Sequence, residues 1–561
     1  MTAGPLDRGR YAQVEAWLAD DPDPTTAAAL SATFTRATHG EPDAQDEIEA
    51  GFAGQLQFGT AGLRAPMGWG PRRMNRLTVG RAAAGFTKWL KAHGAGPVVV
   101  GYDARHNSKD YALDTAQICA GAGLPTFLLP YPLPTPVLAF AIGALRAAAG
   151  IMVTASHNPA HDNGCKVYVG RRQISAPVDA EIARAIDEVT ALRDVPRSDA
   201  WVSLDDDVVS QYLDRAARLV APRSPTDLSV VYTPIHGVAG PVLLAAFERA
   251  GLPAPQVVSE QADPDPDFPT VTSPNPEDPA ALRLALALGT NVDADLVIAT
   301  DPDGDRMAVA VPDPSRRPSA WRILTGDEVG DLLGQYLAED PRPGAFATTI
   351  VSSTRLAAIA ARHHRRFTRT LTGFKWLATV PDLRYAYEEA IGYCVDPDAV
   401  LDKDGITAAL VVVGLAAELR TDGLTLLDAL DDLDRSFGVH LTEQVTITAD
   451  GSDPQWLPRR LAAITADPPS RLAGLRVTQV DDLAAGADDL PPTPGLRLLI
   501  ASPWPDSVIT VVLRPSGTEP KLKAYLQVAR SPGRADLVDE QRRAAADLLA
   551  LLHADVTQVL S

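Results

Sequence analysis

Short apolar segments, each followed at once by a polar loop, constrain the fold of this chain more than any other feature of its sequence. They lie in residues 97–105, 148–156 and 294–300. Short runs of this kind are typical of buried strands, and helical patterns separate them along most of the chain. The alternation predicts an α/β architecture. Because ligands bind beyond the carboxyl ends of strands in such sheets, we expect the chemistry in the loops that follow these segments.

The length and the last part of the chain predict several domains. A chain of 561 residues is too long for one hydrophobic core. Proline-rich joints lie at 195–201 and 221–229, and the proline-studded stretch 263–279 excludes regular structure until a helix start at Asn275. Strand-like runs then dominate the C-terminal part, before a closing helix: 444–448, 498–504, 507–513 and 521–528. The pattern indicates three α/β units followed by a smaller α+β unit.

Charge and composition narrow the partners of this protein. The formal charge is −20, and 46% of the residues are hydrophobic. A strongly acidic protein repels nucleic acid and anionic membranes, so we expect neither as a partner. The N-terminal residues lack the apolar core of a signal peptide, and no apolar run is long enough to span a bilayer. Three cysteines without paired spacing fit free thiols, as in a reducing cytoplasm, where we expect this protein. We further expect either a monomer or a weak dimer.

The loop after the second apolar segment contains a candidate nucleophile. Residues 154–159 read TASHNP, which places Ser156 at the end of a strand, beside His157 and before a stiffening proline. A hydroxyl in this position can serve as an exposed nucleophile. The flanking glycines of a nucleophile elbow are missing, however, and an ordinary turn explains an isolated serine more simply. Ser156 therefore needs support from the rest of the sequence.

The loop after the third apolar segment is rich in carboxylates. Residues 301–306 read DPDGDR, and three aspartates at alternating positions form an oxygen-rich pocket suited to Mg²⁺ or Ca²⁺. The loop is not an EF-hand, because Arg306 and Pro312 stand where that motif needs glycine and glutamate. A solvated acidic turn is the alternative, but three like charges after a buried strand repel one another without a cation. We therefore predict a metal site at Asp301, Asp303 and Asp305.

A third polar loop lies between two strand-like runs near the C-terminus. Residues 514–523 read RPSGTEPKLK, so one arginine, two hydroxyl groups and a glycine stand close together. Such a loop offers bidentate and backbone donors to an anion, so we favour a phosphate site over the alternative, a hairpin turn with incidental polarity. A nucleophile, a metal site and an anion site are together the parts that phosphoryl transfer requires.

Two further polar segments receive a structural interpretation. Residues 402–405 read DKDG and predict a turn. Residues 362–369 form the only dense basic run, which we interpret as a helix end or strand entry in preference to a surface that attracts phosphosugars.

With these motifs in this order, the chain resembles the α-D-phosphohexomutase superfamily, and within it the phosphoglucomutase-2-like branch. The resemblance extends from about Phe58 to the C-terminus. It implies three similar α/β domains and a C-terminal α+β domain, arranged in a heart shape around a central cleft. The implied bounds are 1–200 for domain I, with a helical extension over about 1–50, then 201–322, 323–442 and 443–561 for domains II to IV.

The resemblance also implies site residues. It assigns catalysis to five side chains: Ser156, His157, Lys166, Arg64 and Arg306. It assigns one Mg²⁺ per active site to four: Asp301, Asp303, Asp305 and the phosphorylated Ser156. Ser156 would carry the phosphoryl group, and Lys166 would need a lowered pKa to transfer protons near neutral pH. The implied substrate-binding residues are Gly373, Phe374, Lys375, Glu389, Arg514, Ser516, Gly517 and Thr518.

The sugar loop departs from the pattern common among bacterial relatives. That pattern is GExSGH, whereas residues 388–393 here read EEAIGY, so that Ile391 and Tyr393 replace a hydroxyl and an imidazole. The resemblance implies a magnesium-dependent phosphoglucomutase, an isomerase that interconverts glucose 1-phosphate and glucose 6-phosphate, with glucose 1,6-bisphosphate as bound intermediate and activator. Activity on mannose phosphates stays open. So do four alternatives: a phosphomannomutase, a phosphopentomutase, a glucose-1,6-bisphosphate synthase and a silent sugar-phosphate-binding protein.

Overall fold

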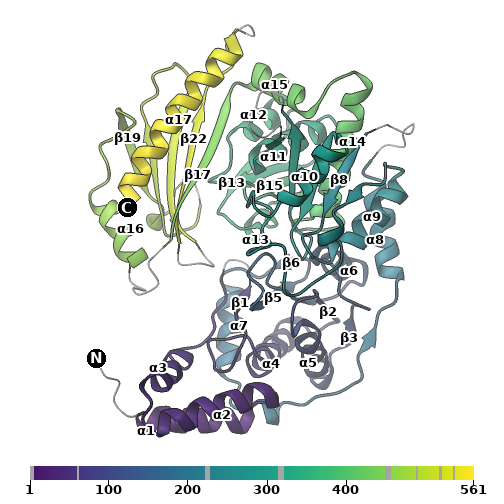
Figure 1. Ribbon diagram of the computed structural model, residues 1–561, viewed down its shortest axis with the longest axis vertical. Coiled ribbons are helices and arrows are strands. Elements are labelled where there is room, and N and C mark those ends of the chain that lie inside the picture. The colour runs from purple at the N-terminus through teal and green to yellow at the C-terminus, as the bar shows by residue number, and fades with distance from the viewer. Residues whose placement is uncertain are drawn as a thin grey trace. The chain divides into compact units, whose positions relative to one another are not determined.

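The computed structural model describes most of the chain (Figure 1). The described residues are 6–59, 62–220, 228–313, 321–448, 456–487, 490–516, 521–534 and 537–560. The chain divides into two compact units, the first comprising Met1–Met307 with Asp398–Leu410 and the second Ala308–Pro397 with Val411–Ser561. Among the described helices, none combines the length and the apolar character needed to cross a bilayer.

The first unit contains a seven-stranded sheet in the order β1-β5-β4-β2-β3-β7, with β6 beside β5. Its strands are β1 (Leu63–Pro66), β2 (Val98–Tyr102), β3 (Thr126–Leu128), β4 (Ala149–Val153), β5 (Asp162–Val169), β6 (Arg172–Gln173) and β7 (Val202–Ser203). As predicted, every residue of β2 and β4 is buried. These two strands pair in parallel, so the loops that follow them emerge at one edge of the sheet. β5 returns antiparallel to β4.

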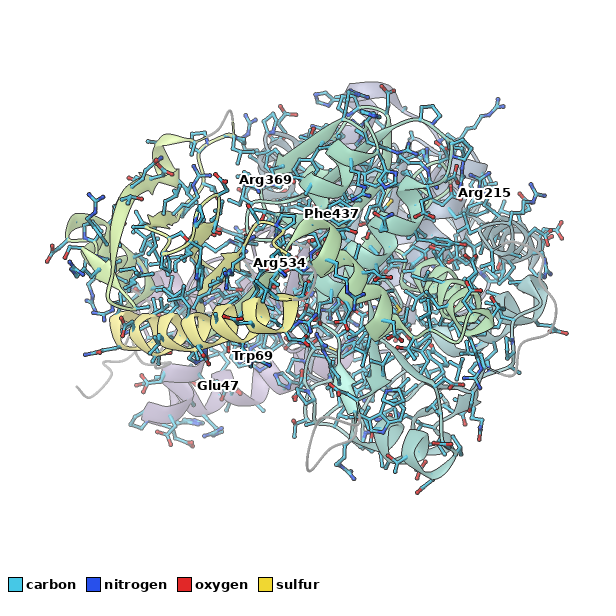
Figure 2. The ribbon with its side chains drawn as sticks, turned by 90° about the horizontal axis from the view of Figure 1, so that it is seen from above. Glu47, Trp69, Arg215, Arg369, Phe437 and Arg534 are labelled. Atoms are coloured by element: carbon cyan, nitrogen blue, oxygen red, sulfur yellow. The ribbon has the colours of Figure 1, made fainter. Side chains whose placement is uncertain are left out.

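Helices pack around this sheet and extend it at the N-terminus. They are α1 (Arg8–Asp20), α2 (Pro24–Thr38), α3 (Pro42–Gly51), α4 (Arg76–Gly94), α5 (Ser108–Gly121), α6 (Thr135–Ala144), α7 (Val178–Asp187) and the short η1 (Leu192–Asp194). Asn75 caps α4, because its side chain accepts a hydrogen bond from Thr78 N at 2.8 Å. A hydrophobic cluster that includes Trp17, Phe52 and Trp69 attaches the first three helices to α4 and α5. Of these three residues, Trp69 is labelled in Figure 2.

The remainder of the first unit has the parallel strands β8 (Val230–Thr233), β9 (Gln256–Val257) and β10 (Leu296–Thr300). Its helices are α8 (Asp207–Ala217), α9 (Ala239–Ala250), η2 (Ser259–Gln261) and α10 (Arg283–Asn291). The connection before α10 is irregular, as predicted, but the helix start expected at Asn275 is wrong. The Asn275 side chain accepts a hydrogen bond from Glu277 N, and Asp278 accepts one from Ala280 N. These local bonds stabilise turns in place of a helix.

The second unit begins with the antiparallel pair β11 (Met307–Pro312) and β12 (Trp321–Ile323). A four-stranded sheet follows in the order β14-β13-β15-β16, formed by β13 (Ala345–Thr349), β14 (Phe367–Thr370), β15 (Leu383–Glu388) and β16 (Gly392–Cys394). The helices are α11 (Gly326–Ala338), α12 (Arg355–Arg362), α13 (Phe374–Leu377), α15 (Leu426–Phe437) and α14 (Gly405–Thr421), which starts in the first unit. Thr325 and Glu328 form a capping box at the start of α11.

The basic run lies where α12 ends and β14 begins, as predicted. Arg365 donates hydrogen bonds to the backbone carbonyl of Ala338 at 3.0 Å and to those of Asp340 and Arg342. Its guanidinium also lies 5.4 Å from the centre of the Phe346 ring. Because it binds carbonyls at and beyond the end of α11, this arginine has a structural role.

The C-terminal part of the second unit is a six-stranded sheet in the order β17-β22-β21-β20-β19-β18. Its strands are β17 (His440–Thr448), β18 (Arg471–Leu472), β19 (Leu475–Asp482), β20 (Leu496–Ile500), β21 (Val508–Pro515) and β22 (Lys521–Ala529). They accompany α16 (Trp456–Ala466), η3 (Leu483–Ala485) and α17 (Val538–Leu560), and α17 lies against β17 and β22 (Figure 1). This arrangement confirms the predicted α+β unit.

Candidate active site

Ser156 lies in the loop between β4 and β5, and its side chain is buried, with 2% exposed. Its φ angle is 51°, in the left-handed region that residues other than glycine seldom adopt. The Ser156 backbone N–H donates to Thr154 Oγ1 at 2.9 Å. Its hydroxyl donates to Asp301 Oδ2 at 2.7 Å and lies 3.3 Å from His157 Nδ1. The candidate nucleophile therefore contacts the carboxylate loop.

The three aspartates of that loop converge on one point. One oxygen from each of Asp301, Asp303 and Asp305 lies within 4.8 Å of the other two, and all three residues are buried. Gly304 turns the loop between them with a φ angle of 71°, which glycine adopts without strain. The Oδ1 atoms of Asp303 and Asp305 are buried and accept no hydrogen bond. Burying a carboxylate oxygen without a hydrogen bond destabilises the folded protein unless another partner binds it. Mg²⁺ is such a partner, because it prefers oxygen ligands.

Lys166, in β5, neutralises part of this negative charge. Its Nζ lies 2.5 Å from Asp303 Oδ2 and 2.5 Å from Asp305 Oδ2. Burial opposes the charged form of Lys166, but the two carboxylates outweigh it and raise its pKa above the ordinary value. The lysine is therefore an ammonium ion near neutral pH. The raised pKa of Lys166 is the opposite of the lowered pKa expected from the sequence for proton transfer, because the carboxylates stabilise the charged form.

Arg306 follows the carboxylate loop directly and contacts its first aspartate. Its Nε donates to Asp301 Oδ2 at 3.0 Å, and a terminal nitrogen donates to Glu277 Oε2 at 3.1 Å. Burial, assisted by the neighbouring Asp303 charge, nevertheless raises the pKa of Asp301 to about 6. Asp301 Oδ2 thus accepts hydrogen bonds from both Arg306 and the Ser156 hydroxyl.

Arg64 and His157 complete this group of side chains. Arg64 lies in β1, where it pairs with Gly164 of β5, and it donates to Asn158 Oδ1 at 3.2 Å. Burial, together with the guanidinium groups of Arg306 and Arg64, holds the pKa of His157 well below 6.5. The imidazole is therefore neutral at pH 7. Because the first unit brings the five predicted catalytic residues together with the three aspartates, they form one connected site.

The predicted sugar-binding carboxylate, Glu389, follows β15 in the second unit. Its Oε2 accepts hydrogen bonds from Thr349 Oγ1 at 2.9 Å and from Ser352 Oγ at 2.8 Å. The two residues that replace the hydroxyl and imidazole of the common pattern are both buried, Ile391 with 4% and Tyr393 with 0% exposed. Their side chains therefore pack inside the protein, whereas the polar Glu389 is half-buried.

The other predicted sugar loop, residues 373–375, begins α13. Gly373 has a φ angle of 104°, which explains the glycine at this position. The Phe374 side chain is buried in a hydrophobic cluster with Leu377 and Val380. A substrate contact from Phe374 would therefore have to come from its backbone, whereas Lys375 is half-buried.

The predicted phosphate clamp lies at the end of β21. Arg514 is half-buried, and the cross-strand residue opposite it on β22 is Lys523. Two like charges at directly opposed positions destabilise a sheet unless an anion offsets them. Ser516 N donates to Lys521 O at 2.8 Å at the base of the loop. Gly517 and Thr518 lie outside the described residues.

Comparisons with known proteins identify the family. Models described as "Phosphoglucomutase/phosphomannomutase, alpha/beta/alpha domain" I, II and III match residues 55–193, 210–314 and 325–434, respectively. A Haemophilus influenzae protein named "Probable phosphomannomutase" is 43% identical over 476 residues, which cover 83% of this chain and 95% of that protein. The chain belongs to the α-D-phosphohexomutase superfamily.

Other phosphohexomutase relatives carry the names of other sugars. A human "Phosphopentomutase" is 33% identical over 550 residues, covering 88% of each chain. A Staphylococcus haemolyticus "Phosphoglucomutase" is 32% identical over 512 residues, covering 86% of this chain and 91% of that one. A solved family protein from Burkholderia thailandensis has the same fold, with a TM-score of 0.66 and 19% identity. The match covers 88% of this chain and 97% of that one. The open form of Paramecium parafusin has a TM-score of 0.63 and 17% identity, and the match covers 89% of this chain and 95% of that one.

The candidate site contains a further cation that its local sequence did not reveal. Lys403, which the sequence predicts only as part of a turn, has its Nζ 3.3 Å from Asp305 Oδ2. Together with Lys166 it outweighs the effect of burial and holds the pKa of Asp305 well below its ordinary value. Gly405 permits the approach, since a Cβ there would lie 2.5 Å from the Arg306 backbone oxygen. The buried Asp402 beside it accepts a hydrogen bond from Tyr168 at 2.7 Å.

Proposed function

We propose that this protein is a magnesium-dependent phosphohexomutase that carries the transferred phosphoryl group on Ser156 and interconverts glucose 1-phosphate and glucose 6-phosphate. The observation that carries this proposal is the 2.7 Å hydrogen bond from Ser156 Oγ to Asp301 Oδ2, one of three converging carboxylates. A phosphoryl group on that hydroxyl would lie beside the proposed cation, where its charge is best stabilised. Membership of the superfamily supports the same chemistry.

The proposed reaction exchanges one phosphate ester for another. The bond between phosphorus and Ser156 Oγ breaks, a bond to a hydroxyl oxygen of the sugar monophosphate forms, and the hydroxyl proton ends on Oγ. The resulting glucose 1,6-bisphosphate stays bound and returns its other phosphoryl group to Oγ by the reverse exchange. His157, neutral and 3.3 Å from Oγ, is our candidate for carrying the proton, whereas Lys166 as an ammonium ion is a candidate donor.

The proposed metal ligands are the three aspartates and the phosphate on Ser156. When bound, Mg²⁺ would stabilise the negative charge that gathers on the oxygens of the transferring group. Lys166, Lys403 and Arg306, which already contact the aspartates, would add fixed positive charge around the same group. Such charges act strongly because the surrounding residues exclude water.

For the rest of the substrate, we propose that Arg514, Ser516 and Lys523 bind the phosphate that is not transferred and that Glu389 binds sugar hydroxyls. Lys523 joins the residues expected from the sequence because it stands opposite Arg514. Binding one phosphate firmly can orient the other for reaction, so the clamp would raise the rate as well as the affinity.

Mannose phosphates are a second candidate substrate, favoured by the name of the Haemophilus influenzae relative that is 43% identical. Initial rates with glucose, mannose and ribose 1-phosphates, each with Mg²⁺ and a trace of the matching bisphosphate, test the choice of sugar. The highest kcat/KM is expected with glucose 1-phosphate. A higher value for ribose 1-phosphate would identify a pentomutase, and accumulation of free bisphosphate would identify a bisphosphate synthase.

The variant Ser156→Ala tests the mechanism itself. The variant removes one oxygen atom and should fold normally, bind phosphosugar and lose nearly all turnover. Labelled bisphosphate should transfer its phosphoryl group to the wild-type protein and not to the variant. Turnover above about one hundredth of the wild-type rate would contradict phosphoryl transfer through Ser156, since removal of a covalent nucleophile costs more than that.

A further inference from the structure

A buried arginine holds the loop that carries Ser156. Arg105 follows β2, and 1% of its side chain is exposed. One terminal nitrogen, Nη2, donates to the carbonyl of Ser156 at 2.7 Å and to that of Asn158 at 2.5 Å. The other, Nη1, donates to the carbonyls of Pro159 at 2.8 Å and Asp162 at 3.1 Å. A single guanidinium thus binds four backbone carbonyls of one short loop, residues 156–162.

The arginine is itself held in place. Asp103 accepts hydrogen bonds through Oδ1 from Arg105 N at 3.0 Å and from Ser108 Oγ at 2.6 Å. Its other oxygen lies 3.5 Å from Arg105 Nε. The buried ring of Phe268 lies with its centre 4.9 Å from the guanidinium carbon. Ionic, hydrogen-bonding and cation–π contacts therefore leave this guanidinium little freedom to move.

The serine loop needs such a restraint. Ser156 has a φ angle of 51°, a conformation that costs free energy for a residue with a side chain. Carbonyls that all turn to one side of a loop also repel one another unless a donor binds them. Ser156 is held at three points, its backbone N–H by Thr154, its carbonyl by Arg105 and its hydroxyl by Asp301.

We propose that Arg105 is a positioning residue for phosphoryl transfer, whose guanidinium holds the serine loop in the conformation that directs Ser156 Oγ toward the metal-binding aspartates. This inference rests on the proposed function of Ser156. Lysine cannot replace the arginine, because an ammonium group has three N–H donors in a tetrahedral arrangement and the loop presents four carbonyls to a planar group. Arg105 itself contacts backbone carbonyls and not the reacting atoms, so it acts only through the loop.

The variant Arg105→Lys tests the inference, with Arg365→Lys as the matched control. Arg365 also binds backbone carbonyls and lies 5.4 Å from a phenylalanine ring, but it serves α11 and not the serine loop. A misplaced reacting group lowers kcat more than substrate binding, so Arg105→Lys should lose at least about tenfold in kcat while KM changes less than about threefold. Single-turnover transfer from labelled phosphoenzyme to glucose 1-phosphate should slow by the same factor. Arg365→Lys should retain kcat within about twofold.

A folded Arg105→Lys protein with wild-type kcat would overturn the inference, as would an equal loss of kcat in Arg365→Lys. If Arg105→Lys does not fold, Phe268→Leu decides, because it keeps the guanidinium and removes only the ring beside it. A loss of about threefold or more in kcat at constant KM supports the inference, and unchanged kcat overturns it. Ser156→Ala separates the two proposals. Activity in Ser156→Ala refutes the proposed function, whereas an inactive Ser156→Ala with a fully active Arg105→Lys refutes only the role of Arg105.

Discussion

At the scale of single residues, two hydroxyl groups determine where the proposed sugar-binding carboxylate points. Thr349 and Ser352 both donate to Glu389 Oε2. Hydrogen bonds to a charged group each contribute about 1.5–3 kcal/mol, and each 1.4 kcal/mol corresponds to about a factor of ten. The double variant Thr349→Val with Ser352→Ala should therefore lose at least about tenfold in kcat/KM for the sugar phosphate.

The neighbouring Thr348 provides the control for this prediction. It is equally buried, and its hydroxyl donates to the Tyr387 backbone carbonyl at 3.0 Å. Thr348 therefore contacts β15, the strand that precedes Glu389, without touching Glu389 itself. Thr348→Val should keep kcat/KM within about twofold of the wild type while lowering the free energy of unfolding by about 1 kcal/mol. Equal losses of kcat/KM in both variants would show that packing of β13, and not the direction of Glu389, determines the rate.

Single residues also show what the sequence can predict about a site. Ser156 and Asp301 stand in short motifs that follow buried strands, so their chemistry is visible locally. Lys403 and Arg105 contact partners far away in the chain, and the residues next to them in the sequence do not indicate those partners. The raised pKa of Lys166 likewise follows from two carboxylates that the fold brings to its side. Contacts of this kind require coordinates, because their energy depends on distances that the linear sequence does not contain.

At the scale of elements, β17 starts with a half-buried histidine, His440. The His440 ring contacts Thr354 Oγ1 at 3.1 Å and the Phe437 carbonyl at 3.3 Å. Burial and the nearby Arg355 lower its pKa from 6.5 to about 3. The folded protein therefore binds fewer protons than the unfolded chain between these values. The free energy of unfolding should fall as the pH drops below about 6.5, and His440 should account for roughly 3–5 kcal/mol of the loss by pH 3.

The variant His440→Gln should flatten this pH dependence. Glutamine keeps a donor and an acceptor but does not titrate, so denaturant unfolding at pH 7, 6, 5 and 4 should show a smaller loss of stability than in the wild type. His553 on α17 is 43% exposed and pairs with Glu443, and His553→Gln should leave the profile nearly unchanged. A His440→Gln profile parallel to that of the wild type would mean that other groups cause the acid sensitivity.

Element by element, the success of the sequence predictions depended on local signals. The strands β2, β4 and β10 are short and wholly buried, and their apolar runs predicted them correctly. The prediction for Asn275 was wrong because the same residue types that cap helices also form turns, and the following prolines favoured the turn.

At the scale of the whole molecule, the proposed function requires an acidic protein to bind acidic substrates. The chain carries a net charge of −20, yet cations gather at both proposed phosphate sites. In the first unit these are Arg64, Lys166, Arg306 and Lys403, and in the second Arg514 and Lys523. Local cations act over a few ångströms, whereas salt screens the field of distant surface carboxylates. Phosphosugar binding can therefore depend on these few groups despite the overall charge.

The same contrast separates a specific metal site from diffuse binding of cations by an acidic surface. At an ionic strength of about 0.15 M the Debye length is about 8 Å, so diffuse attraction is screened while the buried aspartates remain available. After chelation, the protein should be inactive, and added Mg²⁺ should restore turnover and stabilise the fold by about 2.7 kcal/mol at a hundredfold excess over Kd. Asp305→Asn should abolish both effects, whereas Asp267→Asn, which alters a carboxylate that is 74% exposed, should abolish neither. If Mg²⁺ stabilised Asp305→Asn as much as the wild type, the stabilisation would come from the surface, because the Asp305 oxygens are among the three ligand atoms that converge within 4.8 Å.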